Sequence, residues 1–504
     1  MASTSPPSAL PSVPAFPAHL KSRAIATALL VILLGALDQT IVTIAVPTMA
    51  RELGDVAWMA WVVSSYLVAA TVVTPLYGRF GDQHGRRRAL LLAVVVFTLA
   101  SVACAMAQTM PQLLWARVAQ GIGGGGLIAG AQALIADVVP LRDRGRFQGW
   151  IAGVWAFANV AGPVLGGVLT HQLSWHWVFW INLPLCALAL WWIHSVLGSL
   201  NRRGAKARFD SAGAVLLVLG LAALLVPITR IGQGVAWHDP LNSGALLLSV
   251  PVLALFVWHE SRTDAPILPL RLLRIPAVAG CSALGFLVYV VMITLTVMVP
   301  LRAQWVQQLS VNDSAWRLMC MSMGIPFAAW MAGRYMHRRE RTRALLVGGT
   351  VLAPLALLTL VLWPAGAAAW VELPCLFLLG MGLGLQLPTA LVVSQHVVGP
   401  QLIGTVTALS GLSRQLGGAI GVAVLSALLL ALLQAQLPAG HTGGLEALVM
   451  QLHAQAGPAG SGAPDTRALE GPFRAVLWGC LFVALLSLPV ALRIPETRLD
   501  EPHR

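Results

Sequence analysis

Charged residues are scarce in this chain: 10% of its 504 residues are Asp, Glu, Lys or Arg, whereas 57% are hydrophobic. Soluble domains carry about 25% charged residues. A protein surface with so little charge would not stay dissolved in water, so the composition excludes a soluble globular protein. The mean hydropathy of +0.78 favours a protein that lies in a lipid bilayer.

Lysine is nearly absent. Of the 32 basic residues only Lys21 and Lys206 are lysines, and the arginines stand in short clusters between apolar runs. The net charge of +13 would fit a nucleic-acid binder, but such a protein gathers its basic side chains on one folded face. Clusters between apolar runs are typical of membrane proteins with basic cytoplasmic loops, so no nucleic-acid partner is predicted.

Signatures of catalysis and metal binding are also lacking. The chain has no H-E-x-x-H, no G-x-S-x-G and no phosphate-binding G-x-x-x-x-G-K. It is therefore predicted not to be an enzyme, and a polytopic membrane enzyme or sensor is the minor alternative. Its cysteines lie in apolar segments without metal-ligand spacing, so they predict neither a metal site nor a disulfide framework; they are Cys104, Cys186, Cys281, Cys320, Cys375 and Cys480.

Long apolar runs fill the rest of the chain. A helix needs roughly 20 apolar residues to span a bilayer, and only helices satisfy their own backbone groups in lipid. The sequence predicts fourteen spans, at 23–46, 58–78, 89–107, 111–135, 147–169, 177–198, 212–230, 243–259, 277–301, 315–334, 344–363, 370–391, 403–433 and 473–492.

The arginines predict the orientation. The loops after even-numbered spans hold clusters such as 86–88, 142–146, 202–208 and 338–343, whereas the loops after odd-numbered spans hold few basic residues. Both termini are therefore predicted to be cytoplasmic. Residues 1–22 and 494–504 are predicted cytoplasmic tails, the first of them disordered because it is rich in Pro, Ser and Ala. The stretch 434–472 is predicted to be the longest external loop.

A faint internal repeat divides the spans. Residues 78–88 join spans two and three, and the similar segment 333–341 joins spans ten and eleven. This predicts an N-terminal six-helix bundle at 23–199, an inserted pair of helices at 200–274 and a C-terminal six-helix bundle at 275–493. Many transporters build alternating access around such a duplication.

The segment 78–88 has the form G-x-x-x-D-x-x-G-R-R-R. An ordinary positive-inside loop explains its arginines but not an acid flanked by glycines at this spacing. We predict a charge relay that clasps neighbouring helix ends at the cytoplasmic surface. The second copy lacks the equivalent acid. The predicted gate residues are Gly78, Asp82, Gly85, Arg86, Arg87 and Asp137.

These residues resemble the major facilitator superfamily, whose loop between spans two and three carries this signature. Residues 37–47 resemble the 14-span drug:proton antiporter branch of EmrB/QacA type, 117–125 resemble the R-x-x-Q-G-x-G motif, 162–167 are similar to the antiporter motif of exporters, and 177–184 also fit this branch. The resemblance implies an all-α membrane fold of two six-helix bundles plus two inserted helices, fourteen in total, in a bacterial inner membrane.

The same resemblance implies a function. It is proton-coupled efflux of hydrophobic or amphipathic small molecules by alternating access, driven by the proton gradient without a cofactor. Export of one endogenous metabolite is the alternative. The partners are the substrate, protons and the lipid bilayer. The resemblance to EmrB-type pumps also implies a partnership with a periplasmic adaptor and an outer-membrane channel. No residue of this chain is specific to such a partnership.

Asp38 is the most informative single residue, because it is an acid well inside the first apolar run. A carboxylate there is costly unless it faces protein, water or a partner. Such a group can exchange a proton, and the alternative is a structural acid that closes helix contacts. Arg117 begins a face with Gln120 and Gly124 at helical spacing. We predict that Asp38 and Arg117 couple protons, although an arginine near a span end could instead reach toward the interface.

Two further groups complete the predicted site. In span five, small residues at four-residue spacing and a proline predict a close-packed, bendable surface, which serves as a rocking interface or as plain helix packing: Gly153, Gly162, Pro163, Gly166 and Gly167. Most tryptophans fit an aromatic belt, and Glu372 at an external span end is expected to be solvated. The substrate-cavity candidates are Thr40, Gln120, Trp155, Asn159, Gln386 and Arg414.

Overall fold

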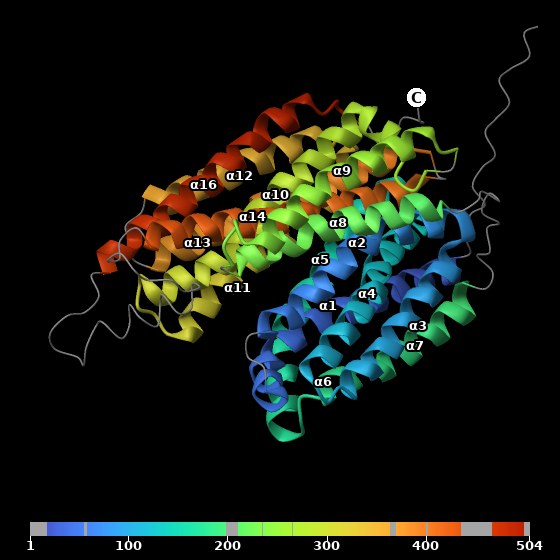
Figure 1. The fold of residues 1–504 in the computed structure, drawn as a ribbon. Coiled ribbons are helices and arrows are strands. Elements are labelled where there is room, and N and C mark those ends of the chain that lie inside the picture. Colours follow the sequence, from blue (N-terminus) through green and yellow to red (C-terminus); the bar gives the residue numbers. More distant parts are fainter. Residues whose placement is uncertain are drawn as a thin grey trace, which may run out of the picture.

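The computed structural model describes residues 18–54, 58–197, 210–233, 235–264, 266–362, 369–399, 402–434 and 466–497. Most of the predicted tail 1–22, most of the predicted external loop 434–472 and most of the tail 494–504 lie outside these ranges. The elements of the described part are helices (Figure 1). This confirms the prediction of an all-α fold.

The first group of helices ends near residue 197. It consists of α1 (Ala18–Leu53), α2 (Met59–His84), α3 (Arg86–Ala105), α4 (Met110–Val138), α5 (Leu141–Gln172), α6 (Trp177–Trp180) and α7 (Asn182–Val196). The sixth predicted span is divided between α6 and α7, which count together as one membrane span.

The second group follows an additional helix pair. The pair is α8 (Ser211–Gly232) and α9 (Pro240–Arg262), and the short helix η3 (Leu270–Arg274) comes next. The second group is α10 (Pro276–Trp305), α11 (Val311–Arg339), α12 (Arg343–Leu362), α13 (Ala369–His396), α14 (Ile403–Gln434) and α16 (Thr466–Arg493).

Thirteen helices of the described part are long and apolar enough to cross a membrane, so the chain is a multi-pass membrane protein. Helix α11 occupies the tenth predicted span but is not among the thirteen. Its sequence is more polar, with Asp313 and Arg317 near its start and a basic end. It still packs along α13 and α5.

Separate apolar clusters form the cores of the two helix groups. Two clusters lie within α10–α16, and two lie within α1–α7. A fifth joins α8, α9 and η3 to α2 and α14. Figure 1 shows the first group in blue to green and the second in yellow to red, with α8 running beside both. Helix α8 packs on α2 and on α14, so it contacts both groups.

Successive spans run in opposite directions, which brings the arginine clusters to one end. The ends of α2 and α11 and the starts of α3, α5 and α14 share this end, which we call the arginine-rich end. Local sequence defines the helix starts. Thr109 accepts a hydrogen bond from the backbone N–H of Gln112 and is followed by Pro111 at the start of α4, an arrangement typical of a helix N-terminus.

The glycines of α4 set how closely α2 and α3 approach it. A Cβ atom at Gly123 would lie 2.5 Å from the backbone nitrogen of Phe97, and backbone cannot move aside as a side chain can. We expect Gly123→Ala to destabilise the protein by about 1–3 kcal/mol through overpacking. Gly153→Ala in α5 is the matched control because its Cβ would meet nothing within 4 Å. The thermal unfolding midpoint in detergent measures both, and equal midpoints would contradict this packing.

Candidate functional site

Asp38 lies at the centre of a buried polar network. Its side chain is 0% exposed. Oδ2 accepts a hydrogen bond from Nη1 of Arg117 at 3.0 Å, and Oδ1 accepts from Nε2 of Gln120 and Nδ2 of Asn182, both at 2.8 Å. In all three hydrogen bonds the Asp38 carboxylate is the acceptor. Asp38 lies on α1, its partners Arg117 and Gln120 on α4, and Asn182 on α7. The arrangement suits a carboxylate, because a protonated oxygen would bring an O–H against a donor.

Arg117 is 1% exposed and joins three helices of the network. Its Nε donates to the backbone oxygen of Val62 on α2 at 3.0 Å. The guanidinium lies 4.4 Å from the centre of the Tyr66 ring, also on α2. A Cβ at Gly124 would lie 2.1 Å from the Tyr66 hydroxyl. Glycine at 124 therefore leaves the space for the tyrosine that supports the arginine.

Asn182, Ser101 and Tyr66 complete this network although sequence reasoning missed their roles. Ser101 accepts from Nε2 of Gln120 at 2.9 Å, which orients the amide that faces Asp38. For Asn182 a signal existed, because it stands inside the segment 177–184 that resembles the exporter branch. Ser101 and Tyr66 are ordinary residues of apolar helices, and nothing in their local sequence marks them.

Asp82 connects the two helix groups at the arginine-rich end. Its carboxylate, 2% exposed, forms an ion pair with Arg86. It also accepts hydrogen bonds from the backbone N–H groups of Gly404 at 3.0 Å and of Thr405 at 2.7 Å, and from the Thr405 hydroxyl. These are free donors at the start of α14, where a negative charge is stabilised by the helix dipole. Asp82 therefore caps a helix of the opposite group.

The remaining predicted gate residues surround this cap. Arg86 also pairs with Asp137 at 2.9 Å, so it bridges two acids within the first group. A Cβ at Gly78 would lie 2.5 Å from the Cβ of Ala408, which shows how closely α2 and α14 approach. Gly85 has a φ of +90°, a conformation that favours glycine, between α2 and α3. Arg87 contacts Nδ1 of His194 at 3.1 Å.

A second contact between the groups lies at the same end. A Cβ at Gly333 of α11 would lie 2.5 Å from the backbone oxygen of Gly145 on α5. His337 faces Asp143 at 3.2 Å. Arg144 approaches Oε1 of Gln395 on α13 at 3.5 Å. The segment 333–341, which lacks the acid of the first copy, thus packs against the start of α5 through glycine backbone.

The glycines of the antiporter motif pack mainly against α1. A Cβ at Gly162 would lie 2.1 Å from Oγ1 of Thr40, and one at Gly166 would lie 2.7 Å from the backbone oxygen of Ile41. By contrast, Gly153 and Gly167 have open space where a Cβ would be. Pro163 is exposed. In this conformation the motif tightens the first group internally, whereas Gly145 and Gly149 of α5 meet α11.

The substrate-cavity candidates lie in different surroundings. Thr40 donates to the backbone oxygen of Ala158 at 2.9 Å, and Trp155 packs into the core of the first group. Gln386 is buried against Gly349 of α12, and Gln120 belongs to the Asp38 network. Asn159 is exposed, and Arg414 is partly buried. Asn159 is thus the most exposed of the six candidates.

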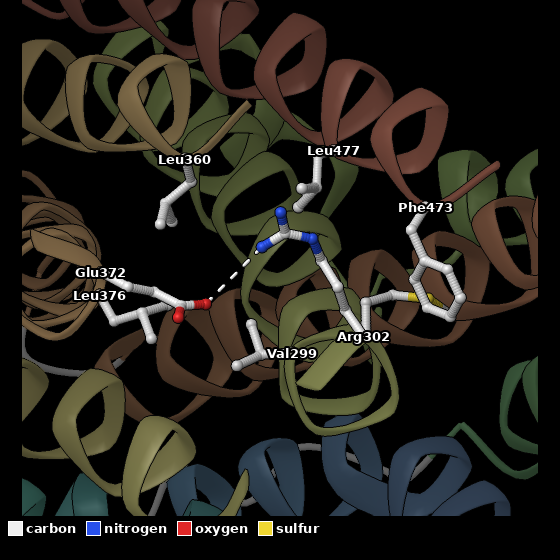
Figure 2. A pocket seen from close by; sticks show the side chains of 8 residues that line it. Val299, Arg302, Leu360, Glu372, Leu376, Phe473 and Leu477 are labelled. Carbon is white, nitrogen blue, oxygen red and sulfur yellow. Dashed lines mark ion pairs between the residues drawn. The ribbon is translucent and has the colours of Figure 1, made fainter. Parts of the chain in front are cut away.

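Glu372 is buried, contrary to the expectation that it is solvated. It is 7% exposed, because Arg317 pairs with it at 3.0 Å and Arg302 at 3.6 Å. Figure 2 shows Arg302 and Glu372 pointing toward one another beside a small cavity that Leu360, Phe473 and Leu477 also line. The cavity of about 20 Å³ has room for about one water molecule. It is therefore too small for an organic substrate.

Comparisons with known proteins agree with this architecture. The family model described as Major Facilitator Superfamily matches residues 28–422. An uncharacterised MFS-type transporter of Mycobacterium tuberculosis is 33% identical over 480 residues, which are 94% of this chain and 69% of that protein. Multidrug resistance protein 3 of Bacillus subtilis is 30% identical over 397 residues, 79% of this chain and 77% of that protein.

The fold also has solved counterparts. The structure of the proton:xylose symporter XylE superposes with a TM-score of 0.62 at 14% sequence identity, and the match covers 96% of this chain and 99% of that one. An identity this low concerns the fold alone. The family match and the sequence relatives identify a membrane transporter and not an enzyme.

Proposed function

The chain belongs to the Major Facilitator Superfamily, and we propose that it is a proton-driven exporter of hydrophobic or amphipathic small molecules in a bacterial inner membrane. The arginine-rich end is the cytoplasmic side in this proposal, in accordance with the positive-inside rule. The chain is assigned to the 14-span drug:proton antiporter branch. Its resemblance to that branch and its similarity to a multidrug resistance protein support the assignment.

The Asp38–Arg117 pair is the single observation that carries the proposal. A buried ion pair is stable only while both partners are charged, and removing one charge strands the other. Protonation of Asp38 would therefore release Arg117, which also holds the backbone of α2 through Val62. Proton uptake would thus loosen the contacts among α1, α2 and α4.

The conformation described here corresponds to one stage of the transport cycle. The caps and glycine contacts at the arginine-rich end hold the two helix groups together on the cytoplasmic side. Asp38 is sealed from water in this stage. The pair must therefore open at another stage, when the groups separate at the cytoplasmic side, for a proton to leave or enter. No cofactor is needed, because the proton gradient supplies the free energy.

Asn159 and Arg414 are the proposed substrate contacts. Asn159 is 14 residues beyond Gly145 on α5, and at about 100° per residue this places both on nearly the same face. That face meets α11 at the arginine-rich end. Farther along α5 the same face carries an exposed amide, which supports a position beside the substrate path. The described residues give no support for a periplasmic adaptor or an outer-membrane channel, so these are not part of the proposal.

Reconstituted vesicles test the proposal. A toxicity panel in a pump-deficient host first identifies a substrate. Purified protein in vesicles should then move that substrate against its gradient when only a pH difference is imposed. A collapsed pH difference is the control and should give no accumulation. Accumulation that persists without the pH difference would disprove proton coupling, and a panel with one responsive compound would favour the dedicated metabolite exporter.

A further inference from the structure

Arg414 lies deep in the membrane-spanning part of α14. It is ten residues beyond Gly404, where Asp82 caps the helix. At 1.5 Å per residue this is about 15 Å from the arginine-rich end, and the apolar core of a bilayer is about 30 Å thick. Arg414 is therefore near the middle of the membrane, where a charged side chain is costly unless it has a partner.

The side chain faces protein rather than lipid. Its Cγ would lie 3.2 Å from a Cβ at Gly285, and its guanidinium lies 5.6 Å from the centre of the Tyr289 ring, both on α10. One turn before it, Gly411 faces Thr74 of α2, and one turn after it, Gly418 faces Tyr289. Arg414 thus points to the junction of α10, α14 and α2, where the two helix groups meet.

Arg414 forms no ion pair or hydrogen bond with the other described residues, and its guanidinium lies over the Tyr289 ring. Two arginines that are buried in the helix groups differ in this respect, because Arg117 pairs with Asp38 and Arg317 pairs with Glu372. The Arg414 side chain is only partly buried, so an incoming group can reach it.

A second polar group beside Arg414, the hydroxyl of Ser410, also lacks a hydrogen-bond partner among the described residues. Ser410 stands one turn earlier on the same face of α14. Its side chain is 8% exposed, and its hydroxyl oxygen is buried without a hydrogen-bond partner in the described part of the chain. A cation, a hydroxyl and an aromatic ring thus converge from two helices. This donor set complements a carboxylate, sulfonate or phenolate attached to an aromatic or apolar body.

We propose that Arg414, Tyr289 and Ser410 form the binding subsite for the negatively charged group of the substrate, and that the exported compounds are amphipathic organic anions. This inference rests on the proposed export function and specifies its substrate class. The proposed substrate class also fits the charged side chains within the spans. Asp38 and Glu372 already hold arginine partners, so a cationic drug would meet an unpaired positive charge at this junction.

Two dyes with a common ring system test the proposal. Fluorescein is an anion at neutral pH and rhodamine 6G is a cation, and both are built on xanthene. Fluorescence polarisation with the purified full-length protein measures their binding. Wild-type protein should bind fluorescein more tightly than rhodamine 6G. Arg414→Gln should weaken fluorescein binding about 10- to 100-fold, the effect of removing a charged hydrogen-bond donor, and should not weaken rhodamine 6G binding.

Arg414→Lys is the matched variant, because it keeps the charge and should keep most of the preference for fluorescein even if Arg414→Gln folds poorly. Wild-type protein that binds rhodamine 6G at least as tightly, or binds neither dye, overturns the proposal, as does equal fluorescein binding by the Gln and Lys variants. The assay needs no pH gradient. Charge-dependent binding without proton-driven transport would therefore refute the coupling mechanism but not the anion subsite. Proton-driven transport without charge-dependent binding would refute the anion subsite alone.

Discussion

Asp38→Asn is expected to abolish substrate accumulation driven by a pH gradient. Asparagine has nearly the shape of aspartate, and its oxygen can still accept the hydrogen bonds from Gln120 and Asn182. It cannot take up and release a proton, and its amide would place a donor against the donor of Arg117. Accumulation in vesicles under an imposed pH difference measures the loss, which should reach the background of protein-free vesicles.

Loss of folding must be separated from loss of coupling in this experiment. Asp38→Asn leaves Arg117 buried without its counter-ion, and stranding one partner of a buried pair costs about 3–5 kcal/mol. The double variant Asp38→Asn with Arg117→Gln removes both charges and should recover much of the thermal stability. It should still show no accumulation. If either variant accumulates substrate with normal dependence on the pH difference, Asp38 is not the coupling residue.

The fold was largely predictable because it follows from apolar run length. Each of the fourteen predicted spans overlaps a helix, and a helix satisfies in lipid all the backbone groups of a single apolar run. The burial of Asp38 and Arg117 within protein was also predictable, because a charged side chain that faces lipid is costly. Their mutual contact was not, since the two residues are 79 positions apart and local sequence does not record which helices touch.

The same limit explains the unexpected placements. Glycine spacing in span five indicated a close-packed face but not the neighbour that packs on it. Gly162 meets α1, whereas Gly149 meets α11 of the other helix group. Glu372 stands at a span end, where solvent is the usual partner. Two arginines from α10 and α11 bury it instead, and neither is close to it in sequence.

Asp82→Asn is expected to shift the protein away from the conformation closed at the arginine-rich end. Asparagine can still cap α14, but it loses the negative charge that faces Arg86 and the α14 helix dipole. Hydrogen bonds to charged groups contribute about 1.5–3 kcal/mol, so the equilibrium should shift about 10- to 100-fold. Transport should slow, because every cycle must pass through this closed state.

A short thiol cross-linker measures the closed population. Cysteines at 143 and 337 would replace the contact between Asp143 of α5 and His337 of α11, in a background where the partly exposed Cys320 and Cys375 are serine. Asp137→Asn is the matched control, because it removes an acid from the same Arg86 without touching α14. Asp82→Asn should lower the cross-linking yield far more than the control. Equal yields would mean that the cap on α14 does not hold the helix groups together, and the gate would then rest on the glycine contacts between α5 and α11.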